Sequence, residues 1–229
     1  MTPLSLRPTA GVSTEICFVL DCENMRNGGR DGWILRLLHR LASNGHVYDW
    51  IQRLAGVSVV DKKLAPWVAT AGRANILDLG GGTGRVSALA PPGARYICLD
   101  VEYPKLQRYL AAHPGGRALM ADATRVPVAD GTIQLVVCVF VAHHLQAHEF
   151  ATLLCEVRRI LTSNGRLVLL DPLSNRGRWQ SRLLWRLDRG AYPKTPEQLL
   201  GVLAEQFSIV HSERFSIYHE YLLAVAAPG

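Results

Sequence analysis

The feature that most constrains this chain is an apolar strand, expected near residues 75–79, that runs into a loop rich in glycine. Asp78 lies in this strand and is followed by Gly80, Gly82 and Gly84, so the segment reads D-x-G-x-G-x-G. Glycine lacks a Cβ, and a loop built from it can adopt positive φ and bring its backbone close to a ligand. A strand that ends in such a turn is typical of a site for a nucleotide-bearing cofactor.

The spacing of the glycines distinguishes among nucleotide-binding loops. A dinucleotide-binding loop has the pattern G-x-G-x-x-G, and counting from Gly80 its third glycine would fall at Arg85. A phosphate-binding P-loop would continue with Gly-Lys and then Ser or Thr, and neither that lysine nor that hydroxyl is present. The spacing therefore argues against both of these loop types.

Four more motifs follow the glycine loop along the chain. Residues 96–99 are strand-like and lead to Asp100, which lies 20 positions beyond Gly80. Residues 121–131 read A-D-A-T-R-V-P-V-A-D-G, and residues 135–145 read L-V-V-C-V-F-V-A-H-H-L. Residues 156–171 then combine a helical segment, a glycine-containing turn and a strand.

With these motifs in this order, the chain resembles the class I S-adenosylmethionine-dependent methyltransferases, in particular their small-molecule, type 11-like branch. The resemblance implies an α/β, Rossmann-like fold with a seven-stranded, mostly parallel sheet, helices on both faces and an antiparallel terminal strand. It also implies S-adenosyl-L-methionine as cofactor and S-adenosyl-L-homocysteine as product. The alternation of strands and helices from Ile76 onward independently favours a parallel sheet with helices on both faces.

The resemblance also implies which residues bind the cofactor. Asp100 would accept hydrogen bonds from the ribose hydroxyls, and Asp122 would approach the adenine amino group. Tyr48 would cover the methionine portion from a helical lid, although it could equally be an ordinary aromatic residue on a helix face. The predicted cofactor site comprises Tyr48, Asp78, Gly80, Gly81, Gly82, Gly84, Asp100, Val101, Asp122, Ala123 and Val139, and no metal site is predicted.

The predicted catalytic residues are His143, His144 and Asp171. Methyl transfer needs a base only where the acceptor must lose a proton, and His is the side chain that titrates nearest neutral pH. Either histidine could instead cap the following helix or pack structurally. Asp171 could orient the substrate or a histidine, or cap the turn that follows its strand.

We predict two parts of the chain, an N-terminal arm and helical lid over residues 1–72 and the methyltransferase core over residues 73–229. Residues 1–29 read as an extended arm, and helices are predicted over residues 34–41, 47–54 and 59–65, the last ending before Pro66. Residues 175–194 form a basic helical insertion. This insertion follows the fifth strand of the core, so we expect it to overhang the ligand-binding edge and to select the substrate.

The remaining core elements follow from local signals. Strands are predicted near residues 75–79, 95–100, 117–120, 134–140 and 165–171, and a terminal hairpin over residues 208–213 and 219–226. The helix after the glycine loop should be short because Pro91 and Pro92 follow it. Thr195, Pro196 and Gln198 form a capping box that starts a helix running to about residue 207.

Composition bears on location and partners. The five cysteines are odd in number and show no metal-ligand spacing, and no apolar run approaches the ~18 residues of a membrane span, so we expect a cytoplasmic protein. Lysine and arginine outnumber aspartate and glutamate by 25 to 19. These basic side chains can lie on solvated helix faces, bind an anionic substrate or support a peripheral membrane contact through basic amphipathic helices.

The function predicted from the sequence is methyl transfer to O, N or C of a moderately apolar small molecule. A nucleic-acid methyltransferase is an alternative, which the absence of an Asn/Asp-Pro-Pro-Tyr/Phe loop after the fourth strand disfavours. A non-catalytic cofactor-binding scaffold of the same fold is another. The oligomeric state and the acceptor are not predicted.

Overall fold

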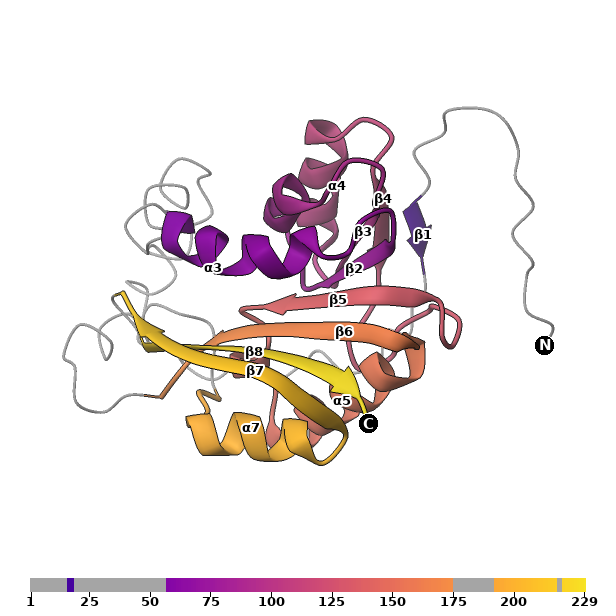
Figure 1. Ribbon diagram of the computed structural model, residues 1–229. Helices are drawn as coiled ribbons and strands as arrows, with labels where there is room; N and C mark the ends of the chain where they lie inside the picture. The colour runs from indigo at the N-terminus through magenta and orange to yellow at the C-terminus, as the bar shows by residue number, and fades with distance from the viewer. Residues whose placement is uncertain (1–15, 19–56, 175–191, 218–219) are drawn as a thin grey trace, which may run out of the picture.

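The computed structural model describes residues 16–18, 57–174, 192–217 and 220–229, which are built around an eight-stranded sheet (Figure 1). The strand order is β1-β4-β3-β2-β5-β6-β8-β7. Neighbouring strands are parallel from β1 through β6, and β8 is antiparallel to both of its neighbours. The strands are β1 (Ile16–Phe18), β2 (Asn75–Leu79), β3 (Arg95–Asp100), β4 (Arg117–Met120), β5 (Ile133–Val139), β6 (Leu161–Pro172), β7 (Phe207–Ser216) and β8 (Glu220–Pro228).

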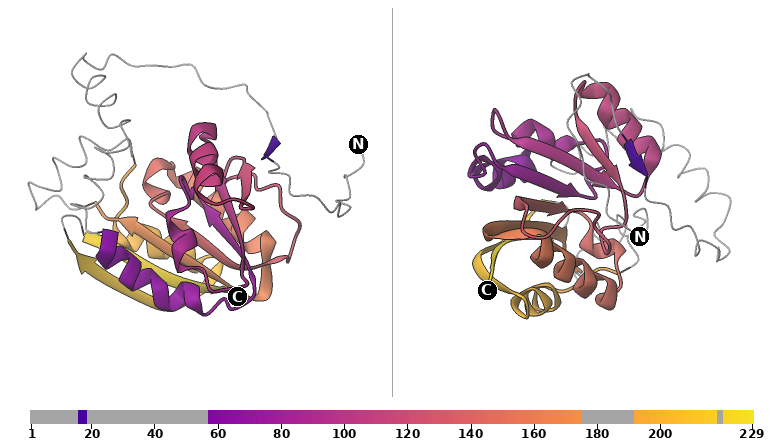
Figure 2. Two further views of the ribbon diagram at one scale, coloured as in Figure 1. Left: turned by 90° about the horizontal axis from the view of Figure 1, so that it is seen from above. Right: turned by 90° about the vertical axis from the view of Figure 1, so that its right-hand side faces the viewer.

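Helices cover both faces of this sheet (Figures 1 and 2). The helices α3 (Val57–Ala69) and α4 (Tyr103–Ala112) and the 3-10 helix η1 (Arg85–Leu89) contribute to one hydrophobic cluster. The helices α5 (Ala147–Ile160) and α7 (Pro196–Ala204) contribute to a second cluster. The sheet is therefore the middle of three layers, and its inner strands β2, β5 and β8 are mostly buried, whereas the edge strand β7 is largely exposed.

The predicted fold class is confirmed, with one strand more than expected. The sequence predicts only an extended arm for residues 1–29, whereas Ile16–Phe18 adds an eighth strand to the edge of the sheet. It pairs in parallel with β4, with Ile16 opposite Ala118. Three residues are too short a segment for a periodicity to identify a strand, so this pairing depends on the sheet edge that accepts it.

Two boundaries differ most from the prediction. The strand β6 begins at Leu161 and not at Gly165, because Leu161 already pairs with Ile133 before the register shifts to Arg166 opposite Leu135. The intervening residues 162–165 form an irregularity inside the strand, which reads as a turn in the sequence.

The helix α3 continues to Ala69, so the prediction that it ends before Pro66 was wrong. Val60, Leu64 and Val68 are spaced four residues apart and are fully buried in the cluster that α3 shares with the sheet. A proline inside a helix costs about 3 kcal/mol, and burying one valine or leucine side chain returns roughly 1.5–3 kcal/mol. Burial on both sides of Pro66 therefore outweighs the lost backbone hydrogen bond.

The division of the chain at residue 72 stays a prediction, because residues 1–15 and 19–56 lie outside the described part. The predicted helices over residues 34–41 and 47–54 and most of the basic insertion, residues 175–191, also lie outside it. None of the helices in the described part of the chain has the length and hydrophobicity that crossing a bilayer requires.

Candidate cofactor and catalytic site

The glycine loop lies at the carboxyl end of β2, between β3 and β5. Its backbone is fastened to β3 at two points: the N–H of Gly81 donates to the carbonyl of Leu99 at 2.9 Å, and the N–H of Gly82 donates to Asp100 Oδ2 at 2.9 Å. Ligands of open α/β sheets bind at this edge. The structure therefore brings the first two predicted cofactor motifs, the glycine loop and Asp100, into direct contact.

Glycine is required at two places in this loop. Gly84 has a φ of 78°, and a Cβ at this position would overlap the buried ring of Tyr109. A Cβ at Gly81 would lie 2.7 Å from Asp78 Oδ2 and 2.8 Å from Cys98 Sγ. Side chains from β2 and β3 thus fill the space that a side chain at Gly81 would need.

Asp100 and Val101 form the neighbouring wall at the end of β3. The carboxylate of Asp100 is 5% exposed, and its Oδ1 accepts from the backbone N–H of Glu102 at 2.8 Å. Each of its oxygens thus accepts one backbone N–H, and a carboxylate has lone pairs for about four hydrogen bonds in total. Val101 is 61% exposed beside it. The pair therefore offers a fixed acceptor next to an apolar surface, which fits a ribose and an adenine ring.

Asp78 is buried beneath the glycine loop, where it accepts a hydrogen bond from the Tyr96 hydroxyl. Burial raises the pKa of Asp78 from its ordinary value of 3.8 to about 7; the Tyr96 hydrogen bond and the Arg85 charge oppose the shift, and Asp100 adds to it. Because Asp78 packs against the inner side of the loop, its influence on a ligand would pass through the loop.

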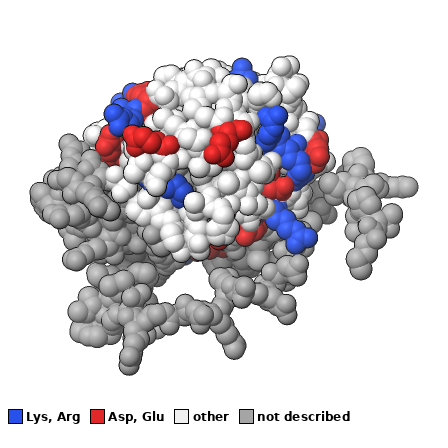
Figure 3. All heavy atoms as spheres, turned by 90° about the horizontal axis from the view of Figure 1, so that it is seen from below, with Lys and Arg blue, Asp and Glu red and all other residues white. Residues whose placement is uncertain are grey.

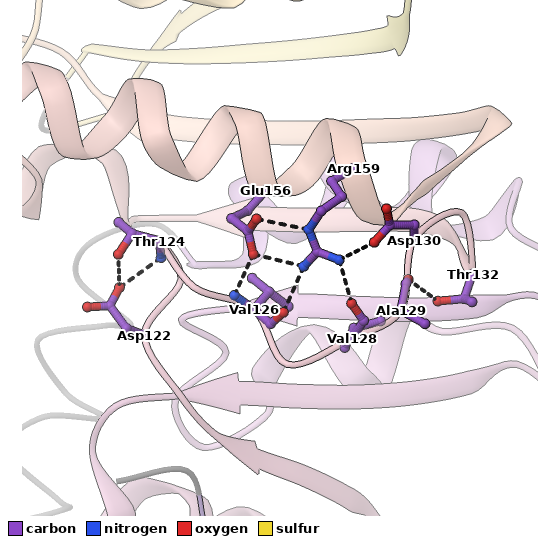
Figure 4. Close-up of polar contacts among 9 residues, drawn as sticks. All are labelled: Asp122, Thr124, Val126, Val128, Ala129, Asp130, Thr132, Glu156 and Arg159. Carbon is purple, nitrogen blue, oxygen red and sulfur yellow. Dashed lines mark hydrogen bonds and ion pairs between the residues drawn. The ribbon is translucent and has the colours of Figure 1, made fainter. Parts of the chain in front are cut away.

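The loop between β4 and β5 forms a third wall, with Asp122 at its start (Figure 4). Asp122 is exposed, and its Oδ1 accepts from both the backbone N–H and the hydroxyl of Thr124, at 2.7 and 2.8 Å. The N–H of Ala121 donates to the carbonyl of Asp100 at 3.3 Å, so this loop begins directly beside the ribose candidate. Ala123 and Val139 are buried around the same edge.

The predicted catalytic residues meet at the next strand ends. The 3-10 helix η2 (Ala142–His144) follows β5 and carries both histidines. His143 is 2% exposed, and its Nδ1 lies 3.0 Å from Asp171 Oδ1, which also accepts the N–H of Ala142 at 3.1 Å. His144 is exposed, and its ring centroid lies 4.0 Å from that of His143. The structure therefore gives the two histidines different environments that their sequence does not distinguish.

Lys194 is a buried residue at this edge that sequence reasoning placed only among the basic residues of the insertion. Its ammonium donates to the carbonyls of Ala142 and Leu145, both at 2.6 Å, and to that of Tyr192 at 3.2 Å. Burial lowers the pKa of Lys194. The N–H of Tyr192 in turn donates to the carbonyl of His143 at 3.0 Å. This lysine therefore fixes the backbone that carries the histidines, and no sequence pattern separates it from the surface cations nearby.

The remaining site predictions concern a lid residue and metals. Tyr48 lies outside the described residues. Within the described residues, no group of three or more His, Cys, Asp or Glu side chains could hold a metal ion. The bare backbone beside Asp100 and the acceptors on two adjacent strand ends do fit a nucleoside cofactor.

Comparisons with known proteins agree with this geometry. Residues 77–169 match a family model described as a methyltransferase domain. A protein of Micromonospora griseorubida named "Putative 23S rRNA (guanine-N(1)-)-methyltransferase" is 36% identical over 101 residues, which cover 42% of this chain and 31% of that relative. An "Uncharacterized methyltransferase" of Mycobacterium sp. strain JLS is 33% identical over 88 residues, covering 38% of this chain and 35% of the relative. The matched segment thus spans about a third of these relatives.

Solved structures share the fold at lower sequence identity. Geranyl diphosphate C-methyltransferase from Streptomyces coelicolor A3(2), in complex with Mg²⁺, geranyl diphosphate and S-adenosyl-L-homocysteine, is 14% identical, with a TM-score of 0.62 over 75% of this chain and 80% of that one. A "putative methyltransferase" from Bacillus halodurans C-125 is 18% identical, with a TM-score of 0.62 over 74% of this chain and 99% of that one. Residues 77–169 thus match a methyltransferase-domain family model, and the strand order belongs to a fold that this chain shares with solved methyltransferases.

Proposed function

We propose that this chain is an S-adenosylmethionine-dependent methyltransferase that transfers a methyl group to O, N or C of a moderately apolar small molecule. The observation that carries the cofactor assignment is the contact between Asp100 and the N–H of Gly82, at 2.9 Å. It joins an acceptor for ribose hydroxyls to a loop that carries no side chain at Gly80, Gly81 and Gly82. When bound, the cofactor supplies a methyl group on a positively charged sulfur.

In this proposal the protein mainly aligns the acceptor with the methyl group. Orientation can contribute roughly 7–11 kcal/mol to lowering a barrier. Gly80, Gly82 and Asp100 would hold the amino-acid and ribose portions, and Asp122 and Val101 the adenine. These residues come from three consecutive strand ends, so their spacing is set by the sheet.

Proton removal, where the acceptor requires it, is assigned to His144. This residue is exposed at the site edge, whereas His143 is buried against Asp171. The hydrogen bond to Asp171 would fix the His143 ring, and its contact with the His144 ring would orient the exposed base. His143 and Asp171 then act through His144.

An apolar small molecule is the preferred acceptor class. The Streptomyces neighbour is named a geranyl diphosphate C-methyltransferase, and the exposed Val101 and Tyr192 offer apolar surface around this edge.

We also propose a cytoplasmic location. The five cysteines are odd in number and do not show the spacing of metal ligands, which supports reduced thiols.

A nucleic-acid acceptor is the second candidate, because the Micromonospora relative is named for a 23S rRNA reaction. Binding to a nucleic-acid backbone calls for a surface on which positive charge dominates. On the face seen in Figure 3, lysine and arginine side chains are interspersed with aspartate and glutamate. Positive charge does not dominate on this face, which therefore lacks the surface that binding to a nucleic-acid backbone calls for.

Calorimetry with S-adenosyl-L-homocysteine tests the proposed cofactor site. The wild type should bind the ligand, and Asp100→Ala should weaken binding by roughly 10- to 100-fold, because hydrogen bonds to a charged acceptor are lost. Asp100→Asn separates loss of charge from loss of shape, and Glu205→Ala removes an exposed carboxylate from the end of α7 as a control. Unchanged affinity in both Asp100 variants would refute the assignment.

A further inference from the structure

The guanidinium of Arg159, near the end of α5, has all five of its N–H donors engaged (Figure 4). Nε and Nη2 donate to the two carboxylate oxygens of Glu156 at 2.9 and 2.8 Å. Nη2 also donates to the carbonyl of Val126 at 2.8 Å. Nη1 donates to the carbonyl of Val128 at 2.8 Å and to Asp130 at 2.6 Å. One side chain on a helix therefore binds three successive points of the loop between β4 and β5.

Glu156 completes this clamp from one turn earlier on the same helix. Its Oε2 accepts a hydrogen bond from the N–H of Val126 at 2.8 Å as well as from Arg159. The hydrogen bonds from Arg159 are the largest cause that lowers the pKa of Glu156, and the one from Val126 adds to the effect. Bidentate arginine–carboxylate pairs fix direction as well as distance. The backbone of Val126 is consequently held through both its N–H and its carbonyl.

The clamped segment is the continuation of the Asp122 turn. Thr124 donates two hydrogen bonds to one carboxylate oxygen of Asp122. Val126, two residues further on, is buried in the core and hydrogen-bonded to Glu156 and Arg159. On the other side of Asp122, the N–H of Ala121 donates a hydrogen bond to the carbonyl of Asp100. Asp122 is thus an exposed carboxylate between two fixed points, and the clamp provides one of them.

We propose that Arg159 is a positioning residue that sets the adenine-reading geometry of Asp122. The inference rests on the proposed function, because it takes Asp122 as the acceptor for the adenine amino group. Arg159 itself does not touch the cofactor in this account. It acts by holding residues 126–130, so that the Asp122 carboxylate stays at a single distance from Asp100.

A purely structural role for Arg159 would weaken the binding of every cofactor analogue alike. A positioning role would specifically affect recognition of the adenine amino group. S-inosyl-L-homocysteine, in which a carbonyl replaces that amino group, separates the two roles when its affinity is compared with that of S-adenosyl-L-homocysteine. The measured quantity is the ratio of the two dissociation constants for each folded variant.

The wild type should prefer the adenosyl ligand roughly tenfold or more, as expected for a hydrogen bond to a charged acceptor. In Arg159→Ala this preference should fall to less than threefold. Arg158→Ala is the matched control, because Arg158 adjoins Arg159 but donates to the carbonyls of Gln206 and Gly229, at 2.9 and 3.1 Å. The control should keep the wild-type preference.

Three results would overturn the inference: a preference retained in Arg159→Ala, a wild type that does not discriminate, or equal loss of preference in the Arg158 control. Each of these leaves the proposed function standing as long as the wild type binds S-adenosyl-L-homocysteine. A wild type that binds neither ligand overturns the proposed function and this inference with it. If Arg159→Ala does not fold, Glu156→Gln removes one arm of the clamp and is judged by the same ratio.

Discussion

Replacing Asp78 with asparagine tests the buried carboxyl beneath the glycine loop. Burial raises the pKa of this carboxyl from 3.8 to about 7 in the folded protein. Between these two values the folded state keeps a proton that the unfolded state has released. Unfolding therefore releases a proton in this range, and the free energy of unfolding falls as the pH rises from about 4 to about 7.

The size of the effect follows from the shift in pKa. A difference of about 3 units corresponds to about 4 kcal/mol over the whole range, at 1.36 kcal/mol per unit. Of this, about 2 kcal/mol is expected between pH 5 and pH 7, and the effect levels off above pH 7. Asparagine resembles the protonated acid in shape and can accept from the Tyr96 hydroxyl, so the Asp78→Asn variant should lack this dependence.

Urea unfolding followed by circular dichroism at pH 5, 6, 7 and 8 measures the difference between wild type and Asp78→Asn. Other titrating groups are common to both proteins and cancel in that difference. The wild type should lose about 2 kcal/mol relative to the variant between pH 5 and pH 7. A difference that is independent of pH, or that changes in favour of the wild type as pH rises, would refute the reasoning.

Three further predictions concern the loop and the edge beside it. Gly84→Ala should destabilise the protein by about 2 kcal/mol or more in urea unfolding, because it combines positive φ with steric overlap, whereas Gly115→Ala, with a φ of 79° and open space, should cost only about 1 kcal/mol; equal costs would contradict the overlap. Lys194→Met should lower the free energy of unfolding by roughly 2–3 kcal/mol, because buried carbonyls lose their donor, and the exposed Lys62→Met should have no such effect. His144→Ala should reduce turnover of a proton-losing acceptor by roughly 100-fold or more while leaving cofactor affinity within twofold; equal turnover would leave His144 a structural role.

The sheet and its ligand-binding edge could be predicted because their signals are local. Each of β2, β3 and β5 is an apolar run that ends at a turn or a polar residue, and all seven predicted strands, the terminal hairpin included, are present near their expected positions. The capping box at Thr195 is also confirmed, with its side chain accepting from the N–H of Gln198. Such elements carry their own start and stop signals within a few residues.

Features that depend on partners distant in the chain could not be predicted. The strand β1 is identified by its pairing with β4, and the passage of α3 through Pro66 by the burial of Val68. No sequence pattern indicates the contacts of Lys194 and Arg159, yet Lys194 is buried on backbone carbonyls and Arg159 binds a loop 29 residues away at Asp130. Their roles arise from tertiary contacts that propensity and periodicity do not encode.

The most direct test of the central claim is a crystal structure of the protein with S-adenosyl-L-homocysteine. The account predicts that both ribose hydroxyls lie within hydrogen-bond distance of Asp100. It places the adenine amino group at Asp122 and the amino-acid portion of the ligand against Gly80 and Gly82. A ligand bound elsewhere, or a glycine loop that turns away from the ligand, would contradict it.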